Sequence, residues 1–249
     1  MTDFDEKAFA ARIEDMAELS ERRGMVFTHF LNERQQFLAE SVLKKLKCEN
    51  YCFSGGAENA DRKILCVFSE YCRPENSDFP MSCITFRFKP SYKLSHRDFL
   101  GALISLNLKR EAVGDILTGD GIAQVFVIDS VKQTVLDEIR KIGSVGVEVS
   151  SDEPLLLDKT QSYREIKGTA ASMRLDCVAG LALGISRSKA AAVISSGAAE
   201  VNYRPVTDTS FILKEGDIFS VRKYGKFRIE EISGVSKKGR IHVNVLKYC

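Results

Sequence analysis

Residues 172–223 read SMRLDCVAGLALGISRSKAAAVISSGAAEVNYRPVTDTSFILKEGDIFSVRK. The pattern predicts a helix whose N-cap is Asp176, followed by a second helix that is capped by Ser186 and ends at Gly197. Alternating apolar residues then predict the strands AEVNY, DIFSVRKY, KFRIEEI and RIHVNVL. We therefore expect residues 170–249 to form a domain of two short helices followed by a β-sheet.

The positive charge of the chain is concentrated in this C-terminal part. Over all 249 residues, 36 Lys+Arg stand against 34 Asp+Glu, but residues 164–249 hold 15 basic and 8 acidic residues, a net charge of +7. The remaining 21 basic and 26 acidic residues give −5. A basic segment on an acidic body is typical of a module that binds a polyanion, and charge alone leaves RNA, DNA and an anionic membrane face open.

The composition is that of an ordinary globular protein. Because 44% of its residues are hydrophobic and only 5 are proline, the chain is expected to bury a core and to divide into two or three small domains. The first residues, MTDFDEKAFAARIEDM, lack the basic region and apolar run of a secretory signal, and no stretch reaches about 18 apolar residues. We expect a cytoplasmic protein with no membrane segment.

Seven cysteines are an odd number for a disulfide framework, and five of them fall in the first third of the chain. Cys48 and Cys52 have the spacing of half a zinc site, whereas the others are scattered through apolar text such as ILCVF. Buried, reduced thiols are the favoured interpretation, with no metal and no cofactor, and a zinc site is the alternative.

The N-terminal part, residues 1–80, is predicted to form an α+β domain. Apolar residues at helical spacing indicate helices over 3–23 and 30–47, separated by a turn at Gly24. The segments YCFSGG and RKILCVFSEY then predict a strand pair.

The central part, residues 81–155, is predicted to form a ferredoxin-like (RRM-like) domain. Its elements are the strand CITFRFK, a helix with Ser95 as N-cap, the strand GIAQVFVID, the helix SVKQTVLDEIRKI and the strand GVEVS, in βαβαβ order. Phe86 and Phe88 share a strand face and could stack on RNA bases. The sequence lacks the glycine-aromatic pattern of such platforms, so we expect both rings in the core, and we expect residues 156–169 to be a linker.

The second helix of the C-terminal domain carries a candidate phosphate site. A helix N-terminus attracts phosphate through its backbone N–H groups, and Arg187 and Lys189 add charged donors beside the hydroxyls of Ser186 and Ser188. Arginine binds phosphate in a bidentate manner, so Arg187 and Arg174 are expected to fix the position of the RNA.

Further candidate contacts lie in two later turns. Asn202, Tyr203 and Arg204 precede Pro205 and offer an amide, an aromatic ring and a guanidinium. These groups could contact a base edge or a 2′-OH. A second turn interleaves basic and aromatic residues, a pattern that suits neutralisation of an RNA backbone with stacking. The candidates in these turns are Asn202, Tyr203, Arg204, Arg222, Lys223 and Lys226.

Several residues of this domain lie at fixed spacings: Arg174-Leu175-Asp176, Ser186-Arg187, Ala190, Ile194, Gly197, Val201-Asn202 and Gly216-Asp217-Ile218. Together they resemble the RNA-binding domain named for small-subunit ribosomal protein S-four. The chain departs from that pattern at Ala198, where histidine is common, and at Tyr203, where glycine is common. The resemblance implies an S-four-like αα-β RNA-binding domain and puts the details of the hairpin contact in question.

A looser resemblance extends over most of the chain. The stretch His96 to Leu103, followed by Leu108-Lys109-Arg110-Glu111 and Gly114-Asp115-Ile116, is similar to the middle domain of bacterial YlmH-like proteins, and Thr28 to Phe37 is similar to their N-terminal region. The resemblance implies a protein of the large ribosomal subunit that binds ribosomal RNA or tRNA and handles stalled ribosomes, with a link to the division gene cluster in some bacteria. The possible second contacts are His96, Arg97, Lys109 and Arg110.

An RNA-modifying enzyme and a protein-interaction module are the alternative functions. The Arg174-Leu175-Asp176 triplet resembles the catalytic motif of pseudouridine synthases, but Asp176 as a helix cap is the simpler interpretation, so we expect no catalytic residue. Gly55-Gly56 and Gly119-Asp120-Gly121 lack the strand-to-helix setting that a methyltransferase needs for its cofactor. The acidic N-terminal helices leave a protein partner, and a role in cell division, open.

Overall fold

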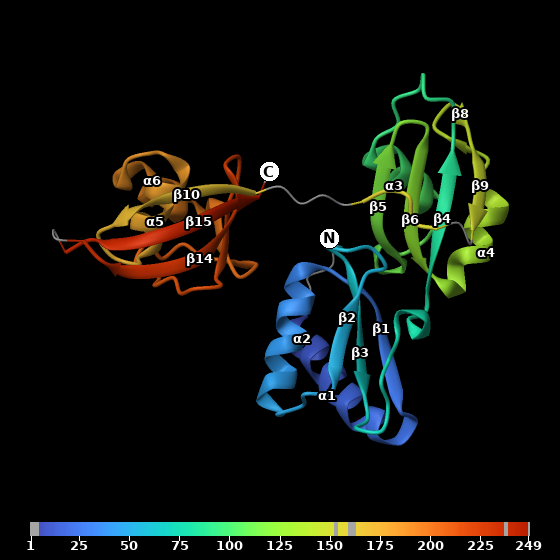
Figure 1. Ribbon diagram of the computed structural model, residues 1–249, viewed down its shortest axis with the longest axis horizontal. Coiled ribbons are helices and arrows are strands. Elements are labelled where there is room, and N and C mark those ends of the chain that lie inside the picture. Colours follow the sequence, from blue (N-terminus) through green and yellow to red (C-terminus); the bar gives the residue numbers. More distant parts are fainter. Residues whose placement is uncertain (1–4, 152–153, 159–162, 237–238, 249) are drawn as a thin grey trace. The chain divides into compact units, whose positions relative to one another are not determined.

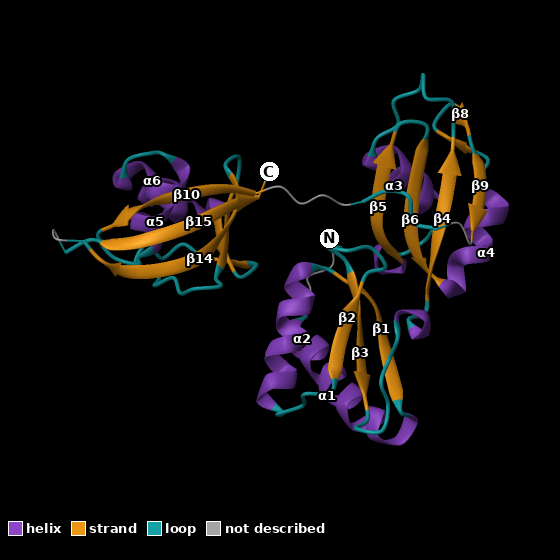
Figure 2. Cartoon of the chain, in the orientation of Figure 1, coloured by secondary structure: helices purple, strands orange, loops and turns teal. Residues whose placement is uncertain are grey.

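The computed structural model (Figure 1) describes residues 5–151, 154–158, 163–236 and 239–248. Its contacts divide the chain into two compact units, Met1–Thr160 and Gln161–Cys249. Each unit combines helices with antiparallel sheets (Figure 2), which confirms the expected α+β class.

Two helices open the first unit, close to where the sequence predicts them. α1 (Glu6–Arg23) begins at its N-cap Asp5, whose carboxylate accepts hydrogen bonds from two backbone N–H groups of the first turn, and it ends at Gly24. α2 (Glu33–Lys45) begins with a capping box at Asn32. Both helices lie against one face of a three-stranded sheet (Figure 1).

An unexpected strand separates these helices. β1 (Met25–Leu31) pairs with β3 (Lys63–Phe68), so the expectation of a simple turn at Gly24 and a helix from residue 30 was wrong. The run MVFTHFL is rich in aromatic and β-branched residues, which favour strands when a partner is available. β2 (Tyr51–Ser54) pairs with the other edge of β3, as predicted, and completes the order β1-β3-β2.

The central part of the chain forms a four-stranded sheet with two helices on one face. The elements follow in the order β4 (Met81–Arg87), α3 (His96–Ser105), β5 (Val113–Gly119), β6 (Ile122–Ile128), α4 (Asp129–Glu138) and β9 (Glu148–Ser151). The antiparallel sheet order β5-β6-β4-β9 is that of a ferredoxin-like domain. The expected βαβαβ order omitted β5. The dipeptide Gly114-Asp115 is typical of a turn, but the first five residues of β5 are buried.

Two short 3-10 turns, η1 (Asn76–Asp78) and η2 (Arg110–Ala112), and a ribbon of two short strands complete the first unit. The ribbon pairs β7 (Lys141–Ile142) with β8 (Val145–Gly146).

Both faces of the four-stranded sheet are covered. On the helical face Phe86 is fully buried, and the ring of Phe99 lies 5.4 Å from Phe86 and 6.0 Å from Phe88, which confirms the expected core role. On the other face, Phe126 and neighbouring side chains form a common core with Phe30 and other residues of the three-stranded sheet. This sheet therefore does not present its aromatic side chains to RNA.

The segment after β9 lies against the same non-helical face. The Gln124 side chain is buried in β6, where its Oε1 accepts hydrogen bonds from the backbone N–H of Leu156 and Leu157 at 2.7 and 3.0 Å. Its Nε2 donates to the carbonyl of Pro154 at 3.0 Å. The described start of the expected linker is thus fixed to the sheet.

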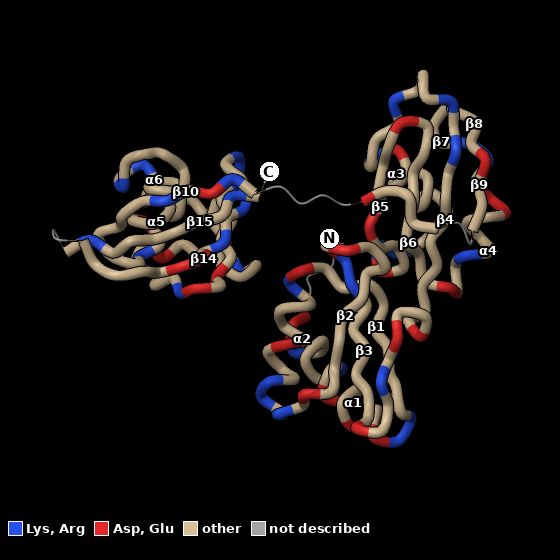
Figure 3. The backbone as a smooth tube through the Cα atoms, viewed as in Figure 1, with Lys and Arg blue, Asp and Glu red and all other residues tan. Residues whose placement is uncertain are grey.

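The second unit contains a six-stranded sheet and two helices. The elements are β10 (Tyr163–Ala170), α5 (Leu175–Leu183), α6 (Arg187–Val193) with a helical extension over Ile194–Ala198, β11 (Ala199–Val201), β12 (Arg204–Pro205), β13 (Ile218–Val221), β14 (Gly225–Val235) and β15 (Ile241–Tyr248). The sheet order is β10-β15-β14-β13-β11-β12. Lys and Arg occur at both ends of this unit (Figure 3).

β10 occupies residues that we expected in the linker 156–169. All eight of its residues pair with β15, more than 70 positions later in the chain, and such a distant partner cannot be read from local sequence. By contrast, Gly184 and Gly197 have positive φ and end the two helices as predicted.

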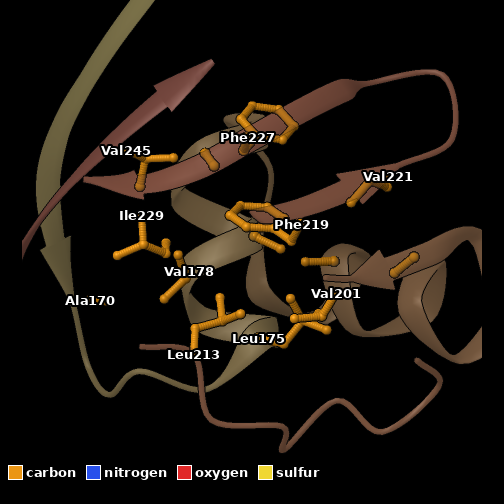
Figure 4. Close-up of a cluster of buried hydrophobic side chains, with 14 of the residues drawn as sticks. Ala170, Leu175, Val178, Val201, Leu213, Phe219, Val221, Phe227, Ile229 and Val245 are labelled. Carbon is orange, nitrogen blue, oxygen red and sulfur yellow. The ribbon is translucent and has the colours of Figure 1, made fainter. Parts of the chain in front are cut away.

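The core of the second unit lies between the helices and one face of the sheet. Leu175 and Val178 of α5 point toward Phe219 and Phe227 (Figure 4), whose rings stack at 5.1 Å. Gly168 lies where α5 crosses β10: a Cβ there would lie 2.5 Å from Leu181 Cδ1, so a larger residue would require the Leu181 side chain to move. The helices are therefore held closely against the sheet.

The described cysteines are unbridged; Cys66 is buried and the others are half-buried. Cys52 and Cys66 face each other across β2 and β3, and burial raises the pKa of Cys66 to about 12. Cys48, Cys72, Cys83 and Cys177 are also unbridged. No group of three or more His, Cys, Asp or Glu among the described residues is placed to hold a metal ion.

Among the described helices, none is individually long and apolar enough to cross a bilayer. α5 and the helical residues 187–198 reach that length only when they are combined, and the chain bends by 107° between them.

Candidate nucleic-acid interface

The start of α5 differs from the prediction for Asp176. Arg174, and not Asp176, is the N-cap residue. The backbone N–H groups of Leu175 and Asp176 donate to the carbonyls of Phe211 and Thr209 at 2.8 and 3.1 Å, so a loop satisfies the first two donors of the helix. The Asp176 carboxylate is therefore available for another role.

Asp176 binds both arginines that the sequence selected as anchors. Arg187 donates from Nε and Nη2 to Asp176 Oδ2 at 3.0 and 2.9 Å, and Arg174 donates from Nε and Nη2 to Oδ1 and Oδ2 at 3.2 Å each. The Asp176 side chain is 5% exposed, whereas those of Arg174 and Arg187 are 35% and 56% exposed. One buried carboxylate thus orients two solvent-facing guanidinium groups.

The electrostatics of this cluster favour the charged forms of its members. Burial by itself raises the pKa of Asp176, but the hydrogen bonds from Arg174 and Arg187 outweigh it and hold that pKa below its ordinary value. The hydrogen bond to Asp176 raises the pKa of Arg174. Asp176 therefore remains ionised at neutral pH and paired with Arg174 and Arg187; we call these three residues the arginine cluster.

The residues at the start of α6 extend this cluster. Ser186 is the N-cap, as predicted, and its Oγ accepts from the Lys189 backbone N–H at 3.3 Å. The hydroxyls of Ser186 and Ser188 lie 3.1 Å apart on the surface. The structure thus brings together Arg174, Ser186, Arg187, Ser188 and Lys189.

A cavity of about 320 Å³ opens beside Arg187, with Thr169 and Cys177 in its lining. Arg240, which sequence reasoning missed, also lines this cavity, and its guanidinium donates to Thr169 Oγ1 and to the Thr169 carbonyl at 3.0 and 2.8 Å. Arg240 is thus a third arginine, beside the two of the cluster.

The Asn202 side chain connects its turn to the start of β13, and its expected contact with a base edge stays a prediction. Asn202 and Tyr203 form the two-residue turn between β11 and β12, both with positive φ, as in a type I′ turn. The Asn202 side chain donates to Asp217 Oδ1 at 2.9 Å and accepts from the Ile218 backbone N–H at 3.0 Å. Its amide is therefore engaged within the domain, while Tyr203 extends over the sheet.

The remaining predicted contacts gather on the sheet, away from the arginine cluster. Lys226 Nζ lies 5.1 Å from the centre of the Tyr203 ring and 4.7 Å from that of Tyr248. Arg222 and Lys223 are exposed in the turn between β13 and β14, and a shallow hollow of about 560 Å³ is lined by residues 220–226. Arg204 is exposed in β12. The structure thus separates the predicted residues into two groups.

The possible second contact in the first unit is only partly surface-exposed. His96, Arg97 and Lys109 are exposed. Arg110 instead donates from Nη1 to the carbonyls of Val113 and Gly114, and burial lowers its pKa. Arg110 is half-buried and supports the backbone at the start of β5, and its expected contact with RNA stays a prediction.

Sequence reasoning also missed two tyrosines at the sheet. Tyr163 and Tyr248 lie in β10 and β15, and their ring centres are 5.1 Å apart. The alternating text IHVNVLKY indicates a strand, but only the pairing of β15 with β10 brings Tyr248 next to Tyr163.

Comparisons with known proteins agree with these observations. Residues 74–154 match the family model described as "Putative RNA-binding domain in YlmH", and residues 173–219 match the model described as "S4 domain". The "Ribosome-associated protein quality control protein P2" of Bacillus subtilis (strain 168) is 31% identical over 242 residues, which cover 96% of this chain and 94% of that protein.

A solved structure supports the fold of part of the chain. The "Cell division protein ylmH from Streptococcus pneumoniae" aligns with a TM-score of 0.51 and 23% identity, over 61% of this chain and 95% of that one. At this identity the similarity concerns the fold alone.

Proposed function

Because the chain belongs to the family of YlmH-like RNA-binding proteins, we propose that it binds ribosomal RNA or tRNA on the large ribosomal subunit, by recognition and without catalysis. The relative from Bacillus subtilis is named for ribosome-associated quality control, and we propose the corresponding role, on stalled ribosomes in the cytoplasm, for this chain.

The arginine cluster is the observation that carries this proposal. Arg187 donates from Nε and Nη2 to Asp176. The Nη1 group of this half-exposed guanidinium can then donate to a phosphate. A guanidinium that is already oriented loses less conformational freedom on binding than a mobile one, and affinity rises accordingly. Lys189 and the Ser186 and Ser188 hydroxyls offer further donors at the same place.

The geometry opposes the pseudouridine synthase alternative. A catalytic aspartate must reach its substrate, but the Asp176 side chain is 5% exposed and both its oxygens accept hydrogen bonds from arginine. Its burial and its two arginine partners favour a role in positioning.

Sedimentation through a sucrose gradient, with and without nuclease, tests the proposed function. We expect the protein to travel with large subunits, and we expect Arg174→Gln combined with Arg187→Gln to move it to the top of the gradient. Lys93→Gln combined with Lys44→Gln removes the same charge from exposed sites in the first unit and serves as the control. Co-sedimentation that survives the double arginine change would contradict the proposed site.

A further inference from the structure

The sheet of the second unit has a face that points away from α5 and α6. Phe227, Ile229 and Val245 point into the core, and side chains alternate along a strand, so Lys226, Arg228 and Tyr248 point to the opposite, outer face. The register pairs Tyr163 directly with Tyr248, which places it on the outer face too. Neither helix of the unit covers these side chains.

Three tyrosines and one lysine form a row across this outer face. The Tyr163 and Tyr248 rings meet edge to face, with an interplanar angle of 65°. Lys226 Nζ lies over Tyr248 on one side and over Tyr203 on the other. We call Tyr163, Tyr248, Lys226 and Tyr203 the tyrosine row; it joins four segments of the domain. Tyr163, at one end of it, is 44% exposed.

Cations surround the row, and some of them are paired with carboxylates. Arg228 lies on the same face and is paired with Glu230, whose hydrogen bond raises the pKa of Arg228. The exposed cations Arg222 and Lys223 lie next to it in the turn between β13 and β14. The outer face continues along β15 to a groove of about 380 Å³ whose lining includes Lys167, which is paired with Glu165, together with His242 and Glu231. Aromatic rings with cations beside them suit a flexible polyanion whose bases are unpaired.

We propose that the tyrosine row is a stacking surface for unpaired RNA nucleotides, separate from the arginine cluster. Bases would stack on Tyr163 and on the neighbouring rings, while Lys226 and the surrounding arginines neutralise the backbone. A base has an aromatic face whatever its identity, so the surface accepts any sequence of single-stranded RNA. The proposal rests on the RNA-binding function above and adds a second site, with its own class of RNA.

Binding of a ten-residue oligouridylate to the full-length protein tests the row. The chain has no tryptophan, so its tyrosine emission can be followed directly. We expect stacking to quench that emission and Tyr163→Ala to weaken Kd about ten-fold, with a larger loss when Tyr248→Ala is added. Tyr163→Phe and Tyr248→Phe keep the ring and should bind normally. Tyr71→Ala, which removes an 88% exposed tyrosine in the first unit, is the matched control.

Thermal unfolding identifies any variant that fails to fold, and ultraviolet crosslinking of the unmodified protein gives an independent measurement. We expect crosslinks to bound oligouridylate in peptides that contain Tyr163 or Tyr248. Unchanged affinity in the folded double-alanine variant, or crosslinks confined to other peptides, would overturn the stacking surface.

Arg187→Gln separates this proposal from the proposed function. We expect it to weaken binding to a structured RNA hairpin while the oligouridylate still binds. If the tyrosine variants lose hairpin binding and Arg187→Gln keeps it, the arginine cluster is not the site for structured RNA. If Arg187→Gln loses binding to both RNAs, the two sites are not separate.

Discussion

Arg187 and Asp176 are 11 residues apart and are joined by two hydrogen bonds to a single oxygen, from Nε at 3.0 Å and from Nη2 at 2.9 Å. This pair ties the first turn of α6 to the first turn of α5 across the bend between them. Arg187, which we propose to contact RNA, therefore also stabilises the packing of α5 against α6.

Replacing Asp176 tests this double role. Asp176→Asn keeps the shape and removes the charge, so two charge-assisted hydrogen-bond pairs weaken, and we expect a loss of about 1–2 kcal/mol because the arginines are partly solvated. In a unit of this size that lowers Tm by several degrees. RNA affinity should fall as well, because Arg187 is no longer held. Asp120→Asn, at an exposed ion pair, is the control for thermal unfolding.

The cluster also makes a prediction for pH. The folded-state pKa of Asp176 lies below its ordinary value of 3.8, so its contribution is complete above about pH 5 and is lost as the pH falls through the lowered folded pKa. The difference in unfolding free energy between the original protein and Asp176→Asn should be constant from pH 7 to 5 and shrink toward pH 3. Urea titrations at each pH measure it. A difference that grows on acidification would contradict the pairing.

Tyr203 occupies a position that favours glycine. Its φ of 62° and the φ of 48° at Asn202 are those of a tight hairpin turn. Tyr203→Ala loses the ring and keeps the strain, whereas Tyr203→Gly loses the ring and removes the strain. We therefore expect the glycine variant to be more stable than the alanine variant by about 1 kcal/mol in urea unfolding. Equal stabilities would show that the turn opens in solution.

Arg62 connects the two sheets of the first unit. It is half-buried, and it donates from Nε to the Val113 carbonyl at 2.9 Å and from Nη2 to the carbonyls of Phe30 and Arg110 at 3.0 and 3.1 Å. Lysine cannot reproduce this fork, so Arg62→Lys should lose about 2–3 kcal/mol. Calorimetry should show the unfolding of the first unit shifted or split, while Arg97→Lys, at an exposed site, should change little.

The salt dependence of RNA binding reports how many phosphates the protein contacts. If the basic residues of the second unit neutralise about four to six phosphates, the slope of log K against log salt is about −3 to −5. Arg187→Gln should make that slope less steep by about one contact. Filter binding between low and moderate salt measures it, and a flat dependence would exclude a phosphate-based contact.

Local sequence determined the elements whose signals lie within a few residues of one another. Ser186, Gly184 and Gly197 mark the ends of α5 and α6 because caps and positive φ depend on single residues. The alternation in β4, β6 and β14 predicted strands for the same reason, and the spacings from Arg174 to Ile218 sufficed to indicate the RNA-binding domain.

Tertiary structure alone decided the roles of residues whose partners are distant. β1, β5 and β10 became strands because complementary edges were available, and long-range pairing outweighs the weak intrinsic preference of such segments. Asp176 became a holder of arginines because the carbonyls of Thr209 and Phe211 had already satisfied the helix start. Tyr163 and Tyr248 met only because β10 pairs with β15. Sequence thus identified which residues carry charge and aromatic rings, and the long-range contacts determined which of them share a surface.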